Sequence, residues 1–222
     1  LLVWADAGPW QRFNETIYML HTGQGMAWLG LILGLMALGA PFMAVTGVIL
    51  WVQARRARPR IKGNVAAGQA DTILLVGSEG GSTWGFAATL HAALTQAGHQ
   101  VHAAPMSQFA PHRYSRAERV IVLAATYGEG AAPASAKGFP DRLAALPNAP
   151  DMPLAVLGFG DRQFPDFCAY AAAVSHMADE KDWEQLLPMA TIDRQSPQEF
   201  ARWGRELGRA LGQPLELSHS PA

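Results

Sequence analysis

The sequence has few cysteines, few charges and no cluster of metal-binding residues. Its single cysteine, Cys168, cannot form an internal disulfide, which suits a reducing compartment. The seven histidines and this cysteine show no spacing typical of a zinc site, which argues against a metal enzyme. Charged residues make up only 16% of the chain and hydrophobic residues 50%, so the composition excludes disorder as the main theme and supports a folded core.

The net charge of −1 hides an asymmetry between the two ends of the chain. Of the 17 Lys and Arg residues, six lie in residues 1–62, which hold only two of the 18 Asp and Glu residues. The first part is therefore about +4 and the remainder about −5. Neither part predicts a nucleic-acid partner, since no basic patch is evident in the larger, acidic part.

Charge is entirely missing from Gly25 to Val52, a run of 28 residues. A helix of this length would reach about 42 Å against a hydrocarbon core of about 30 Å, so residues 25–53 are predicted to cross a membrane. Trp28 and Trp51 lie near its ends, as interfacial aromatic residues do. Residues 54–70 form a basic linker, and by the positive-inside rule this linker and the domain after it lie in the cytoplasm.

A buried helix of a soluble protein is the alternative for this run, although such helices seldom stay apolar on every face. Residues 1–24 are predicted to be extracytoplasmic or interfacial, because apolar residues recur at helical spacing between Trp10 and Leu20. His21 follows them and is either an ordinary interfacial residue or a haem ligand. Small residues in the run favour close packing against other transmembrane helices: Gly30, Gly34, Gly39 and Gly47, with Ala37, Ala40 and Ala44.

These features resemble the last membrane helix of the PepSY-associated transmembrane family. The resemblance is carried by Leu20-His21-Thr22-Gly23-Gln24, by the small-residue span and by Val45-Thr46-Gly47-Val48-Ile49-Leu50-Trp51. Members of that family include ferric-siderophore reductases, so the resemblance implies haem b in the membrane part, with His21 as a ligand.

Strand and helix patterns alternate regularly from Asp71 onward. Short apolar runs predict strands, and a final helix is predicted from its single apolar stripe: strands at 73–76, 100–104, 119–125 and 153–159, and the helix at 197–211. Alternation of this kind implies a doubly wound parallel sheet, with ligands bound beyond the carboxyl ends of the strands. The domain is predicted to span residues 71–213.

The first predicted strand runs into a glycine- and hydroxyl-rich turn, Gly77-Ser78-Glu79-Gly80-Gly81-Ser82-Thr83, which opens a helix ending near Gln96. Backbone N–H groups and a helix dipole would there face a phosphate. The turn holds no Lys or Arg and lacks the Gly-Lys-Ser/Thr of a nucleotide triphosphate site, so a monophosphate fits better. A plain turn with a Ser or Thr helix cap is the alternative.

Two more glycine-rich segments follow predicted strands. Thr126-Tyr127-Gly128-Glu129-Gly130 would let the backbone approach a planar ligand, with Tyr127 free to stack on it. Gly158-Phe159-Gly160-Asp161 is followed by Phe164, which could form the opposite face of an aromatic sandwich. Local packing is the alternative for both rings. All three segments end strands of one sheet, and this coincidence indicates a site more strongly than any single motif.

Together the three segments resemble the flavodoxin-like FMN domain of diflavin reductases, a group that includes sulfite reductase flavoprotein and cytochrome P450 reductase. The resemblance implies a five-stranded flavodoxin-like α/β fold and a set of FMN-binding residues: Ser78, Glu79, Gly80, Gly81, Ser82, Thr83, Thr126, Tyr127, Gly128, Glu129, Gly130, Gly158, Phe159, Gly160, Asp161, Phe164, Phe167 and Cys168. Gly80 stands where the family has Thr and Phe164 where it has Tyr, and residues 171–186 match poorly.

The resulting expectation is an oxidoreductase component in a bacterial inner membrane. Electrons from NADPH would pass through an FAD domain, on the same or a separate chain, to FMN, then to membrane haem and an acceptor such as a ferric siderophore. Residues 214–222 would begin the linker to that FAD domain. One alternative is a tethered electron donor to a soluble partner such as a sulfite reductase haemoprotein. Another is a flavin-free regulatory or anchoring domain.

Overall fold

A computed structural model describes residues 8–22, 27–56 and 61–219 of the chain. The chain divides into two compact units, Leu1–Arg58 and Pro59–Ala222. The C-terminal residues 220–222 of the expected linker, and Gly23 and Gln24 of the membrane resemblance, lie outside the described residues.

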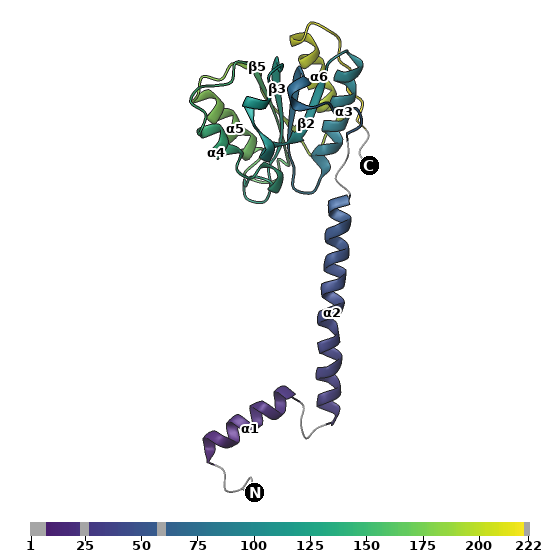
Figure 1. The fold of residues 1–222 in the computed structure, drawn as a ribbon, viewed down its shortest axis with the longest axis vertical. Helices are drawn as coiled ribbons and strands as arrows, with labels where there is room; N and C mark the ends of the chain where they lie inside the picture. Colours follow the sequence, from purple (N-terminus) through teal and green to yellow (C-terminus); the bar gives the residue numbers. More distant parts are fainter. Residues whose placement is uncertain (1–7, 23–26, 57–60, 220–222) are drawn as a thin grey trace. The chain divides into compact units, whose positions relative to one another are not determined.

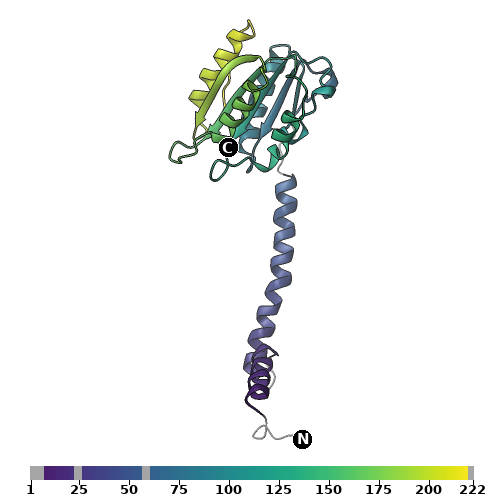
Figure 2. The same cartoon turned by 90° about the vertical axis from the view of Figure 1, so that its left-hand side faces the viewer.

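The described residues of the first unit form two helices. Helix α1 spans Pro9–Thr22, and helix α2 spans Ala27–Arg56 and continues unbroken through Pro41, as both views show (Figure 1, Figure 2). Within the described residues, one helix is long and apolar enough to cross a membrane by length and composition: Ala27–Val52, with a mean hydropathy of 2.1. None of that stretch is buried inside the structure.

The second unit is a five-stranded parallel sheet in the order β2-β1-β3-β4-β5. The strands are β1 (Thr72–Gly77), β2 (Val101–Pro105), β3 (Arg119–Ala125), β4 (Leu154–Gly160) and β5 (Gln185–Asp193). This confirms the predicted fold, and the four strands located from the sequence agree within one or two residues. The order reverses between β1 and β3, and the carboxyl ends of strands at such a point open a ligand crevice.

Helices cover both faces of the sheet (Figure 1). Helices α4 (Phe139–Ala144) and α5 (Ala169–Asp179) pack over one face, and α3 (Ser82–Gln96) and α6 (Pro197–Ala210) over the other. Each central strand is buried on both faces, which explains why β1, β3 and β4 are continuous apolar runs without alternation. The core therefore consists of two layers separated by the sheet.

Strand β5 was not located from the sequence because it lies at the edge of the sheet. Its side chains are mostly half-buried, it contains Pro188, and its register with β4 shifts twice. Edge strands tolerate proline and irregular pairing because one side of their backbone has no partner strand.

The expected linker before the sheet is shorter than predicted. Ala70 is fully buried, and Asn64 forms two hydrogen bonds with the backbone of Ala103, accepting from its N–H at 2.6 Å and donating to its carbonyl at 3.0 Å. The Val65 N–H also donates to the Val101 carbonyl at 3.2 Å. Residues 61–70 thus cover the outer edge of β2 and are part of the domain.

Residues 214–219 likewise pack against the domain, although the sequence predicts the start of a linker there. Leu215 and Leu217 are buried against α6, where a Cβ on Gly204 would lie only 2.5 Å from Leu217. The ring of His219 lies 3.8 Å from that of Phe86 on α3. The segment completes the α3–α6 layer.

Candidate functional site

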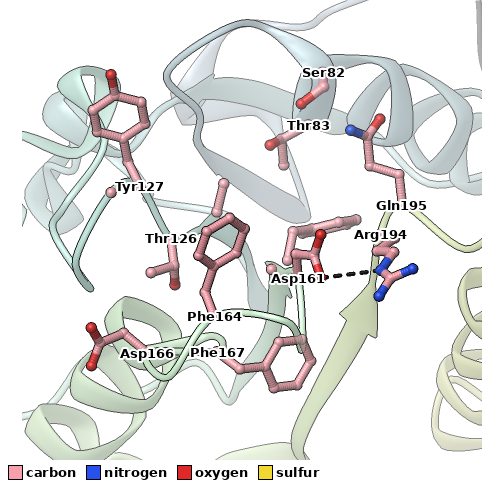
Figure 3. A pocket seen from close by; sticks show the side chains of 14 residues that line it. Ser82, Thr83, Thr126, Tyr127, Asp161, Phe164, Asp166, Phe167, Arg194 and Gln195 are labelled. Carbon is pink, nitrogen blue, oxygen red and sulfur yellow. Dashed lines mark hydrogen bonds and ion pairs between the residues drawn. The ribbon is translucent and has the colours of Figure 1, made fainter.

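The first loop joins β1 to α3 and aims the start of that helix at the crevice. Gly81 caps α3 with φ of +94°, a left-handed conformation that glycine adopts without a steric cost. The first N–H groups of a helix have no partner within it, so those at Ser82 and Thr83 are available to an anion. The side chains of Ser82 and Thr83 line the crevice (Figure 3).

Ser78 and Glu79, at the start of this loop, form hydrogen bonds within the protein and do not line the crevice. The hydroxyl of Ser78 accepts a hydrogen bond from the Gly81 N–H at 3.0 Å, so it shapes the loop. The carboxylate of Glu79 accepts from the Ala134 N–H at 2.6 Å, and the Ser78 N–H donates to the Ser135 hydroxyl at 2.6 Å. These contacts join the loop to the 3-10 turn Ala134–Ala136, a connection that the motif alone did not reveal.

The second loop, after β3, is a tight hairpin closed by reciprocal backbone hydrogen bonds between Tyr127 and Ala131, at 3.1 and 2.8 Å. Gly128 and Gly130 have φ of +53° and +82°, which explains both glycines. The Thr126 hydroxyl accepts from the Tyr170 N–H at 3.2 Å, which connects the loop to α5. The ring of Tyr127 is 56% exposed.

The third segment consists of the end of β4 and the loop after it, and its two glycines, which lie in the strand, serve packing. A Cβ on Gly158 would lie 2.8 Å from that of Ala171, and a Cβ on Gly160 would lie 2.9 Å from the Cys168 nitrogen. Both distances are shorter than real contacts allow. These glycines therefore let α5 approach the end of β4, whereas Phe164 at the loop's tip stays 62% exposed.

A fourth segment, the turn after β5, was missed from the sequence. Its residues Arg194 and Gln195 line the crevice together with the loops described above, and both have positive φ, +45° and +58°. Figure 3 shows them on the side bounded by Ser82 and Thr83, away from Tyr127. The signal was weak because no glycine marks the turn and β5 itself was not located.

The four segments enclose one pocket with a volume of about 510 Å³. Ten of the predicted site residues line it: Ser82, Thr83, Thr126, Tyr127, Gly128, Phe159, Gly160, Asp161, Phe164 and Phe167. Eight predicted residues border the loops without lining it: Ser78, Glu79, Gly80, Gly81, Glu129, Gly130, Gly158 and Cys168. Four lining residues were not predicted: Ala125, Asp166, Arg194 and Gln195.

Two titratable groups near the pocket have shifted pKa values. The pKa of Asp161 lies below its ordinary value, mainly because its carboxylate accepts a hydrogen bond from the Gln163 N–H and also because it pairs with Arg194. Burial raises the pKa of Cys168 to about 11. The thiol is 1% exposed and packs beneath Gly158 and Gly160, so it acts as a small core residue.

The chemistry of the lining fits FMN. Its volume lies within the range of small-molecule sites, about 300–1,000 Å³. Hydroxyl groups and free N–H groups at the start of a 15-residue helix suit a phosphate, and the two exposed aromatic rings suit a flat heterocycle. Within the described residues no group of three or more His, Cys, Asp or Glu side chains could hold a metal ion.

The flavodoxin family model matches residues 74–203, more than half of the chain. The chain belongs to the flavodoxin family. Membership implies the FMN-binding fold that the loops predict. The match does not include the two N-terminal helices, whose resemblance to the PepSY-associated family stays a prediction.

The curated relatives are longer proteins, and this chain matches one part of each. The alpha-component of the NADPH sulfite reductase flavoprotein of Bacillus subtilis is 26% identical over 154 residues, covering 68% of this chain and 26% of that protein. The inducible nitric oxide synthase of Oncorhynchus mykiss is 31% identical over 87 residues, covering 38% of this chain and 18% of that protein. The chain thus spans about a quarter or less of the relatives it matches.

Solved structures show the same fold. Oxidised flavodoxin 2 from Bacillus cereus superposes with a TM-score of 0.56 at 20% identity, covering 64% of this chain and 99% of that chain. A flavodoxin from Pseudomonas aeruginosa gives 0.55 at 22% identity, covering 63% and 96%. The flavodoxin fold therefore accounts for the second unit of this chain.

Proposed function

We propose that the second unit binds FMN in the pocket formed by these four segments and serves as the electron-transfer domain of a diflavin reductase. The observation that carries this proposal is the convergence of the loops after β1, β3 and β4 on one pocket lined by hydroxyls and two exposed rings. Ser82, Thr83 and the start of α3 would hold the phosphate. Tyr127 and Phe164 would hold the ring system.

Bound FMN supplies the redox chemistry, because it accepts and releases electrons without any catalytic acid or base from the protein. The chain's residues bind and orient it. The hairpin after β3 holds Tyr127 through its backbone bonds at 3.1 and 2.8 Å, and the packed base of the loop after β4 presents Phe164. Both rings remain accessible for stacking on a planar ligand.

The electron path that we propose runs from NADPH through an FAD domain to this FMN site, and then to haem in the membrane and an acceptor such as a ferric siderophore. The apolar helix α2, unburied over Ala27–Val52, and the basic residues after it support a membrane anchor with the flavin on the cytoplasmic side. His21, at the end of α1, would serve as one haem ligand.

A soluble acceptor is the second candidate, because the names of the matched relatives describe sulfite reductase flavoproteins. In that case α2 would only tether the domain, and electrons would leave for a separate haemoprotein. Haem absorbance in membranes that contain the chain favours the first candidate, and flavin without haem favours the second.

The test of FMN binding uses the full chain in detergent micelles. We expect the absorbance spectrum of bound flavin, and release of FMN on denaturation. A colourless chain that also fails to take up added FMN would overturn the proposal and leave a flavin-free anchoring domain. An Arg205→Gln variant, changed on the exposed face of α6 away from the pocket, should bind FMN as the unmodified chain does.

A further inference from the structure

The turn after β5 is held in an unusual backbone conformation against the pocket. Arg194 and Gln195 are consecutive non-glycine residues with left-handed φ, a conformation that costs roughly 1–3 kcal/mol at each position. Two backbone hydrogen bonds and one to a side chain stabilise it. The Arg194 N–H donates to the Gly160 carbonyl at 2.8 Å, the Ser196 N–H to the Asp193 carbonyl at 2.9 Å, and the Arg162 N–H to the Asp193 carboxylate at 2.9 Å. Two of these bonds join the turn directly to the loop after β4.

This conformation brings the guanidinium of Arg194 to the carboxylate of Asp161. Its Nε donates to Oδ1 at 3.1 Å, and both side chains line the pocket (Figure 3). Arg194 is the one Lys or Arg residue among the described lining, where Asp161 and Asp166 are the acidic ones. Removing Arg194 would therefore double the net negative charge of the wall, from about −1 to about −2.

As a surface ion pair, this contact would add little to stability. Arg194 is 55% exposed and Asp161 31% exposed, and such pairs contribute roughly 0–1 kcal/mol. The charge of Arg194 has a larger effect on a bound ligand whose own charge changes. Each electron that a flavin takes up adds a negative charge unless a proton accompanies it, and a cation on the pocket wall stabilises that charge.

We propose that Arg194 raises the electron affinity of flavin bound in the pocket. Its guanidinium offsets the negative charge of Asp161, so that reduced flavin binds more tightly than it would beside the carboxylate alone. This inference rests on the proposed FMN site. The acidic charge that predominates in residues 63–222 would by itself lower the flavin's potential. Arg194 acts in the opposite direction, from a segment that carries no flavin motif.

The experiment compares Arg194→Gln, Arg194→Lys and the control Arg205→Gln in the full chain in detergent micelles. Dissociation constants for FMN and midpoint potentials from dye-coupled reductive titration are measured for each. In Arg194→Gln we expect the ratio of the dissociation constants for reduced and oxidised flavin to rise about 3- to 10-fold. That corresponds to a fall in potential of about 30–60 mV for a one-electron step.

Arg194→Lys keeps the positive charge and should keep the midpoint potential of the flavin. A merely structural role of the arginine would not explain that result. Equal potentials in Arg194→Gln and the unmodified chain, or equal losses in the Gln and Lys variants, would overturn the inference. Arg194→Met, which also lacks the charge, replaces Arg194→Gln if that variant does not fold. An unmodified chain that takes up no FMN would overturn the proposed function and this inference with it, whereas uptake with an unchanged potential in Arg194→Gln would overturn the inference alone.

Discussion

The glycine-rich segments at the ends of β3 and β4 have similar sequences but use their glycines differently. Gly128 and Gly130 follow β3, whereas Gly158 and Gly160 lie in the last residues of β4. Each segment presents one exposed aromatic ring, Tyr127 or Phe164. In the loop after β3, a Cβ on Gly128 would meet no atom within 4 Å, and φ of +53° explains the glycine. At the end of β4, Gly160 is required by the close approach of the backbone at Cys168. Similar motifs thus encode a backbone conformation in one segment and a close contact in the other.

Among the glycine substitutions, the largest expected loss of stability comes from filling the close contact at Gly160, the last residue of β4. In Gly160→Ala the new Cβ would lie 2.9 Å from the Cys168 nitrogen and 3.1 Å from the Phe167 ring, and backbone cannot move aside cheaply. The free energy of unfolding should fall by about 1–3 kcal/mol in urea denaturation. Gly80→Ala is the matched control, because no atom lies within 4 Å of its Cβ position. Equal stability of the two variants would erase the distinction between the loops.

Substitution of the two exposed rings should weaken FMN binding and leave stability nearly unchanged. Tyr127→Ala and Phe164→Ala should each weaken FMN binding about tenfold, because a stacking surface is lost. The free energy of unfolding without FMN should change by less than about 0.5 kcal/mol, since both rings are exposed. Phe200→Ala, at a fully buried ring, should instead cost about 3–5 kcal/mol. Unchanged FMN affinity in both loop variants would remove the aromatic sandwich.

A conformational origin of Gly128 predicts a smaller loss. Gly128→Ala has open space but must adopt φ of +53°, at a cost of about 1 kcal/mol. Gly128→Asn should lose less, because asparagine tolerates this conformation better. Thermal unfolding of both variants measures the difference. A larger loss in the Asn variant than in the Ala variant would indicate crowding, as in the other loop.

The packing beneath the loop after β4 also predicts a dependence on pH. Burial raises the pKa of Cys168 from 9.0 to about 11, so above pH 9 the unfolded chain ionises first and the folded state loses stability until about pH 11. Relative to Cys168→Ala, the unmodified chain should lose on the order of 1 kcal/mol between pH 8 and pH 10. The comparison cancels other titrations, including that of Tyr170, whose pKa is raised to about 12 by burial. A difference between the two chains that is independent of pH would place the thiol in contact with solvent.

Much of the second unit was predictable from its sequence because its central strands are buried on both faces. Uniform apolar runs identified β1, β3 and β4, and the alternation with helices identified the parallel sheet. Strand β5 and the turn at Arg194 were not predictable from the sequence. An edge strand has a mixed pattern of apolar and polar residues, and the left-handed turn contains no glycine. The boundaries of the domain were also set too narrowly. Residues 61–70 and 214–219 look like polar linkers in the sequence and pack through a few contacts, such as those of Asn64 and Leu217.

The amino-acid sequence by itself determined the parallel α/β fold, the apolar helix before it and the three motifs at the strand ends, because each depends on local composition and spacing. Only the tertiary structure decided which motif residues face the pocket, which glycines serve packing, and that Arg194 joins Asp161 on the wall. These features depend on segments far apart in the chain meeting at one point. No local pattern encodes the distance between them.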